Sequence, residues 1–180
     1  MKKSIVSLII GAFIMTGAFA QANSKTAVVY FSATGNTERL AKTTASAMKA
    51  DLFKIEPEQP YTSADLNWND KNSRSTKECN DPKSRPAIKN KIDVSSYDTV
   101  IIGFPVWWYN APKIIYTFVE NSDLSGKKVV LICTSGGSGL GSTTGDLSKL
   151  DPKADWRRGT RFSPRASEKE VKDFLEKALE

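Results

Sequence analysis

The sequence contains no histidine among its 180 residues, and this absence removes several classes of function at once. A Ser-His-Asp triad, a zinc or haem site with histidine ligands and a histidine general base are all excluded. Cysteine is also scarce, with Cys79 in a polar segment and Cys133 at the end of an apolar run. An even number permits one disulfide in an exported protein, but Cys133 also fits an ordinary buried strand position. The sequence therefore leaves the pairing of the two cysteines open.

Long apolar runs are missing after the amino-terminal segment. There, Lys2 and Lys3 precede an apolar stretch over residues 5–19, and Ala18-Phe19-Ala20 offers a small-x-small cleavage site. This pattern predicts a secretory signal peptide over residues 1–20, and hence export to the periplasm or another extracytoplasmic compartment. No later segment approaches the roughly 18 apolar residues of a membrane span, so we expect no integral span in the mature chain.

Acidic residues are outnumbered by basic ones, which gives a formal net charge of +6. Loss of the two signal-peptide lysines lowers this charge to +4, and the remaining length suits one domain, over residues 25–180. A basic cluster permits an acidic partner or an anionic lipid, although such runs are more often solvated edges. No nucleic-acid partner is expected, because no recognised binding module accompanies the charge. The cluster comprises Lys153, Arg157, Arg158, Arg161 and Arg165.

Apolar runs alternate with helical patterns along most of the chain. Strands are predicted at 26–31, 51–55, 98–103, 127–133 and 156–162, with helices after 37, over 112–119 and 142–150, and from 167 to the end. The polar segment 56–96 is too long for a structureless loop, so we expect a short helix around 63–70. The alternation predicts an α/β fold, a three-layer doubly wound domain with a five-stranded parallel sheet.

Ligands of such folds lie beyond the carboxyl ends of the strands, so the loops after the first, third and fourth predicted strands are candidates. The first loop, 32–37, is small and hydroxylated and leads into a helix, whose free N–H groups suit a phosphate. It lacks both the lysine of a Walker loop and the G-x-G-x-x-G pattern of dinucleotide sites. The ordinary alternative is a helix cap made by Thr34 or Asn36.

The other two loops suit a planar ring. The second, 103–112, carries three adjacent aromatic residues at 107–109, which offer flat apolar contact but would equally cap the core. The third, 134–142, has four glycines, which let the backbone approach a ligand edge, or form a flexible connector. A phosphate seat, a ring platform and a glycine edge together describe flavin mononucleotide (FMN).

The three loops read S-x-T-G-N-T, G-F-P-V-W-W-Y-N-A-P and T-S-G-G-S-G, and Tyr97-Asp98 precedes the third predicted strand. With these motifs the chain resembles the flavodoxin-like proteins, in the short-chain bacterial branch close to flavin-dependent reductases, over essentially all of residues 25–180. The resemblance implies noncovalent FMN. It implies contacts to the phosphate from Ser32, Ala33, Thr34, Gly35, Asn36 and Thr37, and contacts to the isoalloxazine from Pro105, Val106, Trp107, Trp108, Tyr109, Asn110, Ser135, Gly136, Gly137, Ser138 and Gly139.

Three functions are consistent with these features. The first is an electron carrier that exchanges electrons with a redox partner protein or a small acceptor. The second is an FMN-dependent reductase of quinones or similar acceptors, and the third is a flavin-free binding module on the same fold. Flavodoxins are usually acidic and cytoplasmic, whereas this chain is basic with a predicted signal peptide, so the usual cytoplasmic reductase partners do not follow. No catalytic residue or metal ligand is assigned.

Overall fold

The sheet of this protein is parallel, and its strand order is that of a doubly wound fold. The computed structural model describes residues 25–180, so the predicted signal peptide lies outside the described residues. The strands are β1 (Thr26–Tyr30), β2 (Asp51–Lys54), β3 (Thr99–Pro105), β4 (Lys128–Thr134), β5 (Asp155–Trp156) and β6 (Thr160–Arg161). Their order is β2-β1-β3-β4-β5, with β6 also paired to β4. The predicted fold class is confirmed.

The last predicted strand is divided into two short pieces. Instead of one strand over 156–162, β5 pairs with the start of β4 and β6 pairs with its end. The interruption falls at Arg157-Arg158-Gly159, which supplies no apolar side chain to either face of the sheet. The two pieces lie beside residues that can pack on the domain. Trp156 in β5 packs against the core on one face of the sheet, and Phe162, directly after β6, is buried in the core on the other face, at 5% exposed.

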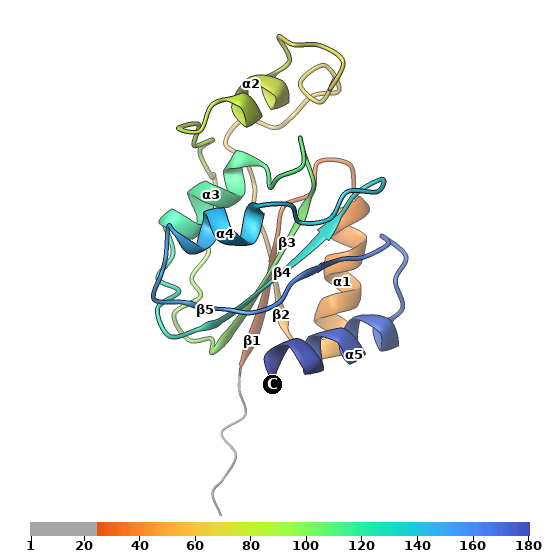
Figure 1. The fold of residues 1–180 in the computed structure, drawn as a ribbon, viewed down its shortest axis with the longest axis vertical. Coiled ribbons are helices and arrows are strands. Elements are labelled where there is room, and N and C mark those ends of the chain that lie inside the picture. The colour runs from red at the N-terminus through yellow and green to blue at the C-terminus, as the bar shows by residue number, and fades with distance from the viewer. Residues whose placement is uncertain (1–24) are drawn as a thin grey trace, which may run out of the picture.

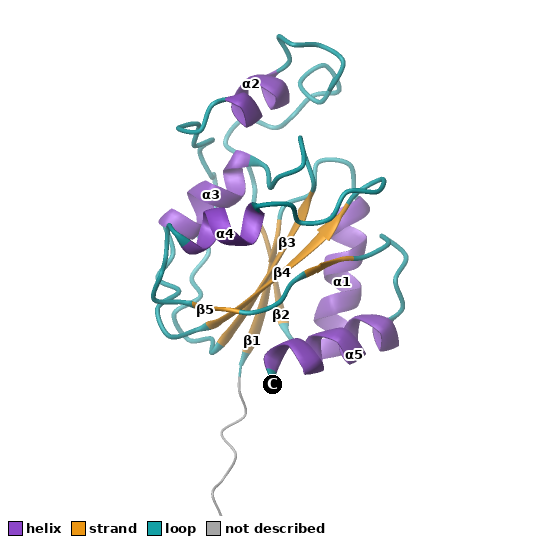
Figure 2. Ribbon diagram, in the orientation of Figure 1, coloured by secondary structure: helices purple, strands orange, loops and turns teal. Residues whose placement is uncertain are grey.

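Helices cover both faces of the sheet (Figures 1 and 2). Helices α1 (Asn36–Met48) and α5 (Glu168–Leu179) lie on one face, and α3 (Lys113–Glu120) and α4 (Thr143–Ser148) lie on the other. Side chains alternate along β1, since Val29 packs toward α3 and α4 and Val28 packs toward α1 and α5. Burial of both faces explains why the central strands are almost wholly apolar. Within residues 25–180, no helix has the length and apolar character to cross a bilayer.

The amino-terminal ends of α5 and α2 show why one helix could be predicted from the sequence and the other could not. The capping box before α5 is confirmed, because Ser167 Oγ accepts a hydrogen bond from the Glu170 amide. The helix predicted around 63–70 is wrong, because α2 spans Arg74–Asn80. Side chains before it bond to nearby backbone amides, as in Asn69 N to Asn67 Oδ1 at 3.1 Å, which favours turns over helix.

Helix α2 belongs to neither helical layer. Figure 1 shows it beyond the carboxyl ends of β3 and β4, carried by the long segment 56–96. An isolated bridge between Pro57 and Ile88 closes this segment at its base. The segment is therefore a separate lobe placed over the edge of the sheet where a doubly wound fold binds its ligand.

Both cysteines are free thiols in the structure. Cys79 lies on α2 and Cys133 lies on β4. Burial raises the pKa of Cys79 to about 12 and that of Cys133 to about 11. Both thiols are therefore protonated at neutral pH and poor nucleophiles.

Candidate functional site

The loops that follow β1, β3 and β4 converge on one edge of the sheet. The strand order reverses between β1 and β3, so the connections leaving these two strands diverge and open a crevice. Backbone bonds tie the loops together, from Phe31 N to Gly103 O and from Val106 N to Thr134 O, each at 2.9 Å. The three loops predicted to share a ligand therefore do meet.

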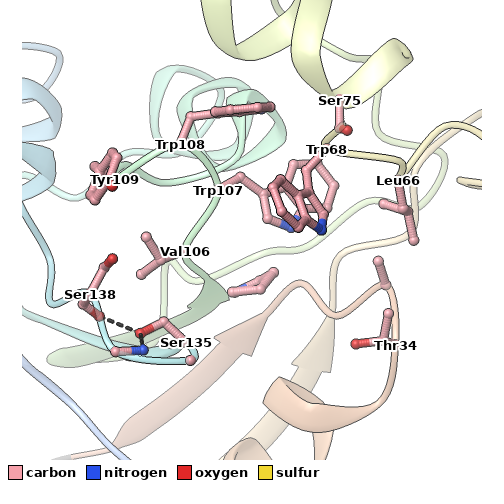
Figure 3. A pocket seen from close by; sticks show the side chains of 14 residues that line it. Thr34, Leu66, Trp68, Ser75, Val106, Trp107, Trp108, Tyr109, Ser135 and Ser138 are labelled. Atoms are coloured by element: carbon pink, nitrogen blue, oxygen red, sulfur yellow. Dashed lines mark hydrogen bonds between the residues drawn. The ribbon is translucent and has the colours of Figure 1, made fainter. Parts of the chain in front are cut away.

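A cavity of about 720 Å³ lies between these loops (Figure 3). This volume falls within the range of roughly 300–1,000 Å³ that is usual for small-molecule sites. None of its lining side chains is charged. They are Ala33, Thr34, Leu66, Trp68, Ser75, Pro105, Val106, Trp107, Trp108, Tyr109, Ser135, Gly136, Gly137 and Ser138. Of the predicted contacts, Ser32, Gly35, Asn36, Thr37, Asn110 and Gly139 are not part of this lining.

The first loop leads into α1, and no side chain caps the amino-terminal end of this helix. Gly35 is the N-cap residue, at φ +86°, and no side chain caps the helix, so the alternative role of Thr34 or Asn36 as caps is wrong. The Gly35 amide itself donates to Ser32 Oγ at 3.1 Å. Amides in the first helical turn have no partner within the helix and attract anions. The loop therefore retains donors for a phosphate.

Thr37 differs from the other hydroxyl residues of this loop. Its side chain is 1% exposed, and its Oγ1 lies 2.8 Å from Thr134 Oγ1. The hydroxyl thus links the loop after β1 to the end of β4. Thr34, by contrast, is exposed and lines the cavity, so its hydroxyl is available to a ligand.

The aromatic residues of the second loop form a tight turn. Trp107 and Asn110 exchange two backbone hydrogen bonds of 2.9 Å, and the residues between them, Trp108 and Tyr109, have φ of +50° and +63°. Positive φ at both central positions is the geometry of a type I′ turn, where glycine and asparagine are usual. The turn therefore holds two large aromatic side chains in a backbone conformation that they disfavour.

The two tryptophans of this turn have different environments. Trp107 makes edge contacts with Phe31 and Tyr61, with ring centroids 5.6 and 5.2 Å apart, and packs against the core. Trp108 is 41% exposed at the rim of the cavity. The structure therefore places one tryptophan in an aromatic cluster and leaves the other accessible to a ligand.

Asn110 supports the turn from outside the cavity. Its Oδ1 accepts hydrogen bonds from Thr143 Oγ1 at 2.6 Å and Tyr116 OH at 3.2 Å, and its Nδ2 donates to Asp146 Oδ2 at 3.2 Å. The hydrogen bond from Ser142 holds the pKa of Asp146 below its usual range, so the acceptor is ionised at neutral pH. This network fixes the aromatic turn to α3 and α4.

The backbone of the third loop, after β4, borders open space. A Cβ added to Gly136 or Gly137 would meet no protein atom within 4 Å. The Gly137 amide donates to Ser135 Oγ at 3.2 Å, and the Ser135 hydroxyl donates in turn to the Ser138 carbonyl. The loop is thus internally bonded and leaves room beside its backbone for the edge of a ligand.

Gly141 is expected to control the aromatic turn. Its φ is +55°, and a Cβ there would lie 2.4 Å from the Tyr109 carbonyl oxygen. We expect Gly141→Ala to lower the free energy of unfolding by more than the cost of a left-handed residue, about 1–2 kcal/mol, because the clash with the Tyr109 carbonyl adds to it and displaces the turn. Urea denaturation with Gly139→Ala as the control measures this effect, since a Cβ at Gly139 meets nothing within 4 Å. Equal stability of the two variants would contradict the assigned contact.

Sequence reasoning missed the fourth wall of the cavity, which comes from the lobe around α2. Leu66, Trp68 and Ser75 contribute to it. The one sequence signal was an aromatic residue, Trp68, within a polar segment. Nothing in the periodicity of that segment indicated that it folds back over the sheet edge.

The lobe is anchored to the aromatic cluster. Tyr61 OH donates to Glu78 Oε2 at 2.6 Å, and Arg74 Nε donates to Glu78 Oε1 at 2.6 Å. The Arg74 guanidinium also lies 4.0 Å from the centroid of the Tyr61 ring. Burial, followed by the bond to Glu78, raises the pKa of Tyr61. Tyr61 contacts Trp107, so the lobe is joined directly to the cavity wall.

Comparison with known proteins identifies close structural relatives. The family model described as Flavodoxin matches residues 25–178. A crystal structure of a protein from Bacteroides eggerthii, described as a flavoprotein, shares 49% identity with a TM-score of 0.83 and covers 88% of this chain and 99% of its own. One from Bacteroides uniformis shares 45% identity with a TM-score of 0.80, over 85% and 98% of the two chains.

A more distant structure supports the fold alone. The flavoprotein of Lactobacillus acidophilus, solved in complex with FMN, is 20% identical with a TM-score of 0.67, over 87% of this chain and 99% of its own. A comparison with curated protein sequences gave no match.

Proposed function

Because this chain belongs to the flavodoxin family, it is a flavin-binding redox protein whose cofactor is FMN, and we propose that it acts as an electron carrier. The cavity fits this cofactor. Its lining combines the loop before α1, the aromatic turn and an open glycine backbone, and its side chains are uncharged. FMN supplies the electron transfer when bound, while the protein binds and orients it.

The residues present have separate tasks in holding FMN. Thr34 and the first amides of α1 would bind the phosphate, as donors to an anion. Trp108 and Tyr109 would contact the ring, and the backbone at Gly136 would approach its edge. Thr37 and Asn110 fix the loops that carry these groups.

One observation favours a carrier over an enzyme with acid–base chemistry. The cavity lining contains no carboxylate, imidazole, amine, guanidinium or thiol. General acid–base catalysis requires a positioned group that exchanges protons near neutral pH. The phenol of Tyr109 is the one ionisable side chain of the lining, and the absence of a carboxylate, amine or imidazole beside it agrees with simple exchange of electrons through the flavin.

We also propose that the mature protein functions outside the cytoplasm, on the basis of its predicted signal peptide. A basic surface then suits an acidic redox partner. Arg157 of the basic cluster pairs with Asp155 at 2.7 Å. No other member of the cluster forms an ion pair within residues 25–180, so four cations remain for a partner.

Absorbance spectroscopy and steady-state kinetics test this function. The purified protein is expected to bind one FMN per chain, to accept electrons from a chemical reductant and to pass them to an added oxidised carrier. With a nicotinamide donor and a quinone, turnover is expected to be negligible. Rapid turnover would replace the carrier with the reductase, and failure to bind FMN would favour the flavin-free binding module.

A further inference from the structure

Lys113 is buried, although lysine side chains are almost never buried unless they are paired. It is the first residue of α3 and is only 9% exposed. Within residues 25–180 its ammonium forms no ion pair with a carboxylate. Its Nζ lies 4.4 Å from the centroid of the Tyr116 ring, whose face attracts the cation without neutralising it. The start of a helix is also the positive end of its dipole, so this position opposes a cation twice.

The ion pairs around Lys113 leave its charge unbalanced. Its charge acts on two side chains, since it contacts Tyr116 and opposes the rise that burial causes in the pKa of Cys79 on α2. Three carboxylates lie around these two side chains, and each forms an ion pair with a cation other than Lys113. The pairs are Glu78–Arg74 at 2.6 Å, Glu120–Arg85 at 2.7 Å and Asp146–Lys149 at 3.6 Å.

The aromatic turn separates this charge from the cavity on one side. Tyr116 OH donates to Asn110 Oδ1 at 3.2 Å, and Asn110 closes the turn that carries Trp107 and Trp108. Both tryptophans line the cavity, whereas Lys113 does not. The ammonium on the Tyr116 ring is therefore one layer of side chains behind the cavity wall.

Helix α2 gives the same placement from the other side. Cys79, which lies within the field of Lys113, follows Ser75 by four residues on this helix. Residues four apart lie on the same face of a helix, and Ser75 lines the cavity. Lys113 therefore lies between α3 and the lobe around α2, outside the cavity but close to it.

A buried charge at this depth affects a charge inside the cavity. Water and salt screen exposed charges strongly, but they screen buried charges much less. At an effective dielectric constant of about 20, two unit charges about 12 Å apart still change an equilibrium constant about tenfold. Reduction of FMN adds negative charge to its ring, whereas the charge of its phosphate is common to both states. A nearby cation therefore favours the reduced state.

We propose that Lys113 tunes bound FMN, because its unbalanced buried charge stabilises the reduced, anionic ring over the oxidised one and raises the reduction potential. This inference rests on the proposed function, since it requires FMN in the cavity. Lys113 acts through its field and touches no ligand, so its role is electrostatic rather than catalytic. The role explains why a cation is retained where burial and the helix dipole both oppose it.

Three variants separate the charge from the side chain. Lys113→Met removes the charge and keeps a flexible apolar side chain, and Lys113→Arg keeps the charge. Lys77→Met is the matched control, because Lys77 also lies on α2 but is exposed, so its charge is screened. Titration of the FMN-saturated proteins against a dye of known potential, at low and high salt, gives the ratio of affinities for reduced and oxidised FMN. Urea denaturation of the FMN-free proteins measures the effect on the fold.

We expect Lys113→Met to weaken reduced FMN about tenfold more than oxidised FMN, at both salt concentrations. This ratio lowers the potential of a one-electron step by about 59 mV. Lys113→Arg, and Lys77→Met at high salt, should keep the ratio within about twofold of the wild type. Without FMN, Lys113→Met should unfold at the same or a higher urea concentration than the wild type, because it removes an unpaired buried charge.

The outcomes against this role are distinct. An unchanged ratio in Lys113→Met, even with a higher urea midpoint, would overturn it, because the charge would then not reach the flavin. An equal shift in Lys77→Met would show that any nearby charge suffices. Equal weakening of both redox states would direct the charge of Lys113 to the phosphate instead. Failure of the wild-type protein to bind FMN would refute the proposed function itself.

Discussion

FMN is expected to bind at least a hundredfold more tightly than riboflavin, which lacks only the phosphate. The first turn of α1 has amide donors without a side-chain cap, and Thr34 adds a hydroxyl beside them. Hydrogen bonds to a charged group contribute about 1.5–3 kcal/mol each, so two of them account for the expected ratio. No lysine is required, because the helix start supplies the positive potential.

Two threonine variants separate binding from structure in this loop. Thr34→Val should weaken FMN about tenfold and leave riboflavin unchanged, since the hydroxyl faces the phosphate site. Thr37→Val should lower the free energy of unfolding by about 1 kcal/mol, because it leaves Thr134 Oγ1 without its partner at 2.8 Å, but it should preserve the FMN-to-riboflavin ratio. Titration of each flavin by fluorescence quenching gives both ratios. Equal losses for the two flavins in Thr34→Val would refute the phosphate assignment.

The central sheet and the positions of its loops could be predicted from the sequence because they depend on local patterns. Strands such as β3 and β4 are buried on both faces, so each reads as a continuous apolar run bounded by polar residues. The order of strands and helices then follows from right-handed crossovers, and it places the ends of β1, β3 and β4 at one edge. Three walls of the cavity were therefore accessible to sequence reasoning.

The fourth wall could not be predicted, because the lobe around α2 is organised by polar contacts among its own side chains and backbone. Its residues from 62 to 72 form turns through their own side chains, which leave no periodic apolar pattern. Trp68 is recognisable as part of a site only once the segment lies over the sheet edge. No sequence spacing shows that Tyr61 reaches Glu78 and Trp107 together.

The hydrogen-bond partners of the loop side chains also could not be predicted from the sequence. A motif lists hydroxyl and amide groups near a ligand, but it does not say which of them bond within the protein. Thr37 and Asn110 both belong to the predicted loops, and both use their side chains to join one loop to another element. Their contribution to a site is to set its shape, which depends on partners about 30 and 100 residues away.

Replacement of Glu78 is expected to disturb the cavity from a distance. Its carboxylate accepts hydrogen bonds from Tyr61 and Arg74. The side chain of Glu78 is only 12% exposed and that of Arg74 is 23% exposed. Removing one partner from a buried pair costs about 3–5 kcal/mol, and partial exposure reduces this, so Glu78→Gln should lower the free energy of unfolding by about 2–3 kcal/mol. A glutamine keeps only one acceptor oxygen, so Tyr61 and Arg74 can no longer both donate to it. The weaker hold on Tyr61 loosens its contact with Trp107, which should weaken FMN about tenfold.

A matched pair elsewhere in the chain provides the control. Glu120 binds Arg85 through two bonds of 2.7 Å, but it is more exposed and lies at the end of α3, outside the cavity lining. Glu120→Gln should therefore cost less than about 1 kcal/mol and leave FMN affinity unchanged. Urea denaturation and FMN titration of both variants separate two roles for the lobe. A loss of stability in Glu78→Gln with unaltered FMN affinity would mean that the ion pair supports the lobe without acting on Trp107, whereas losses of both would show that the lobe positions the aromatic wall of the flavin site.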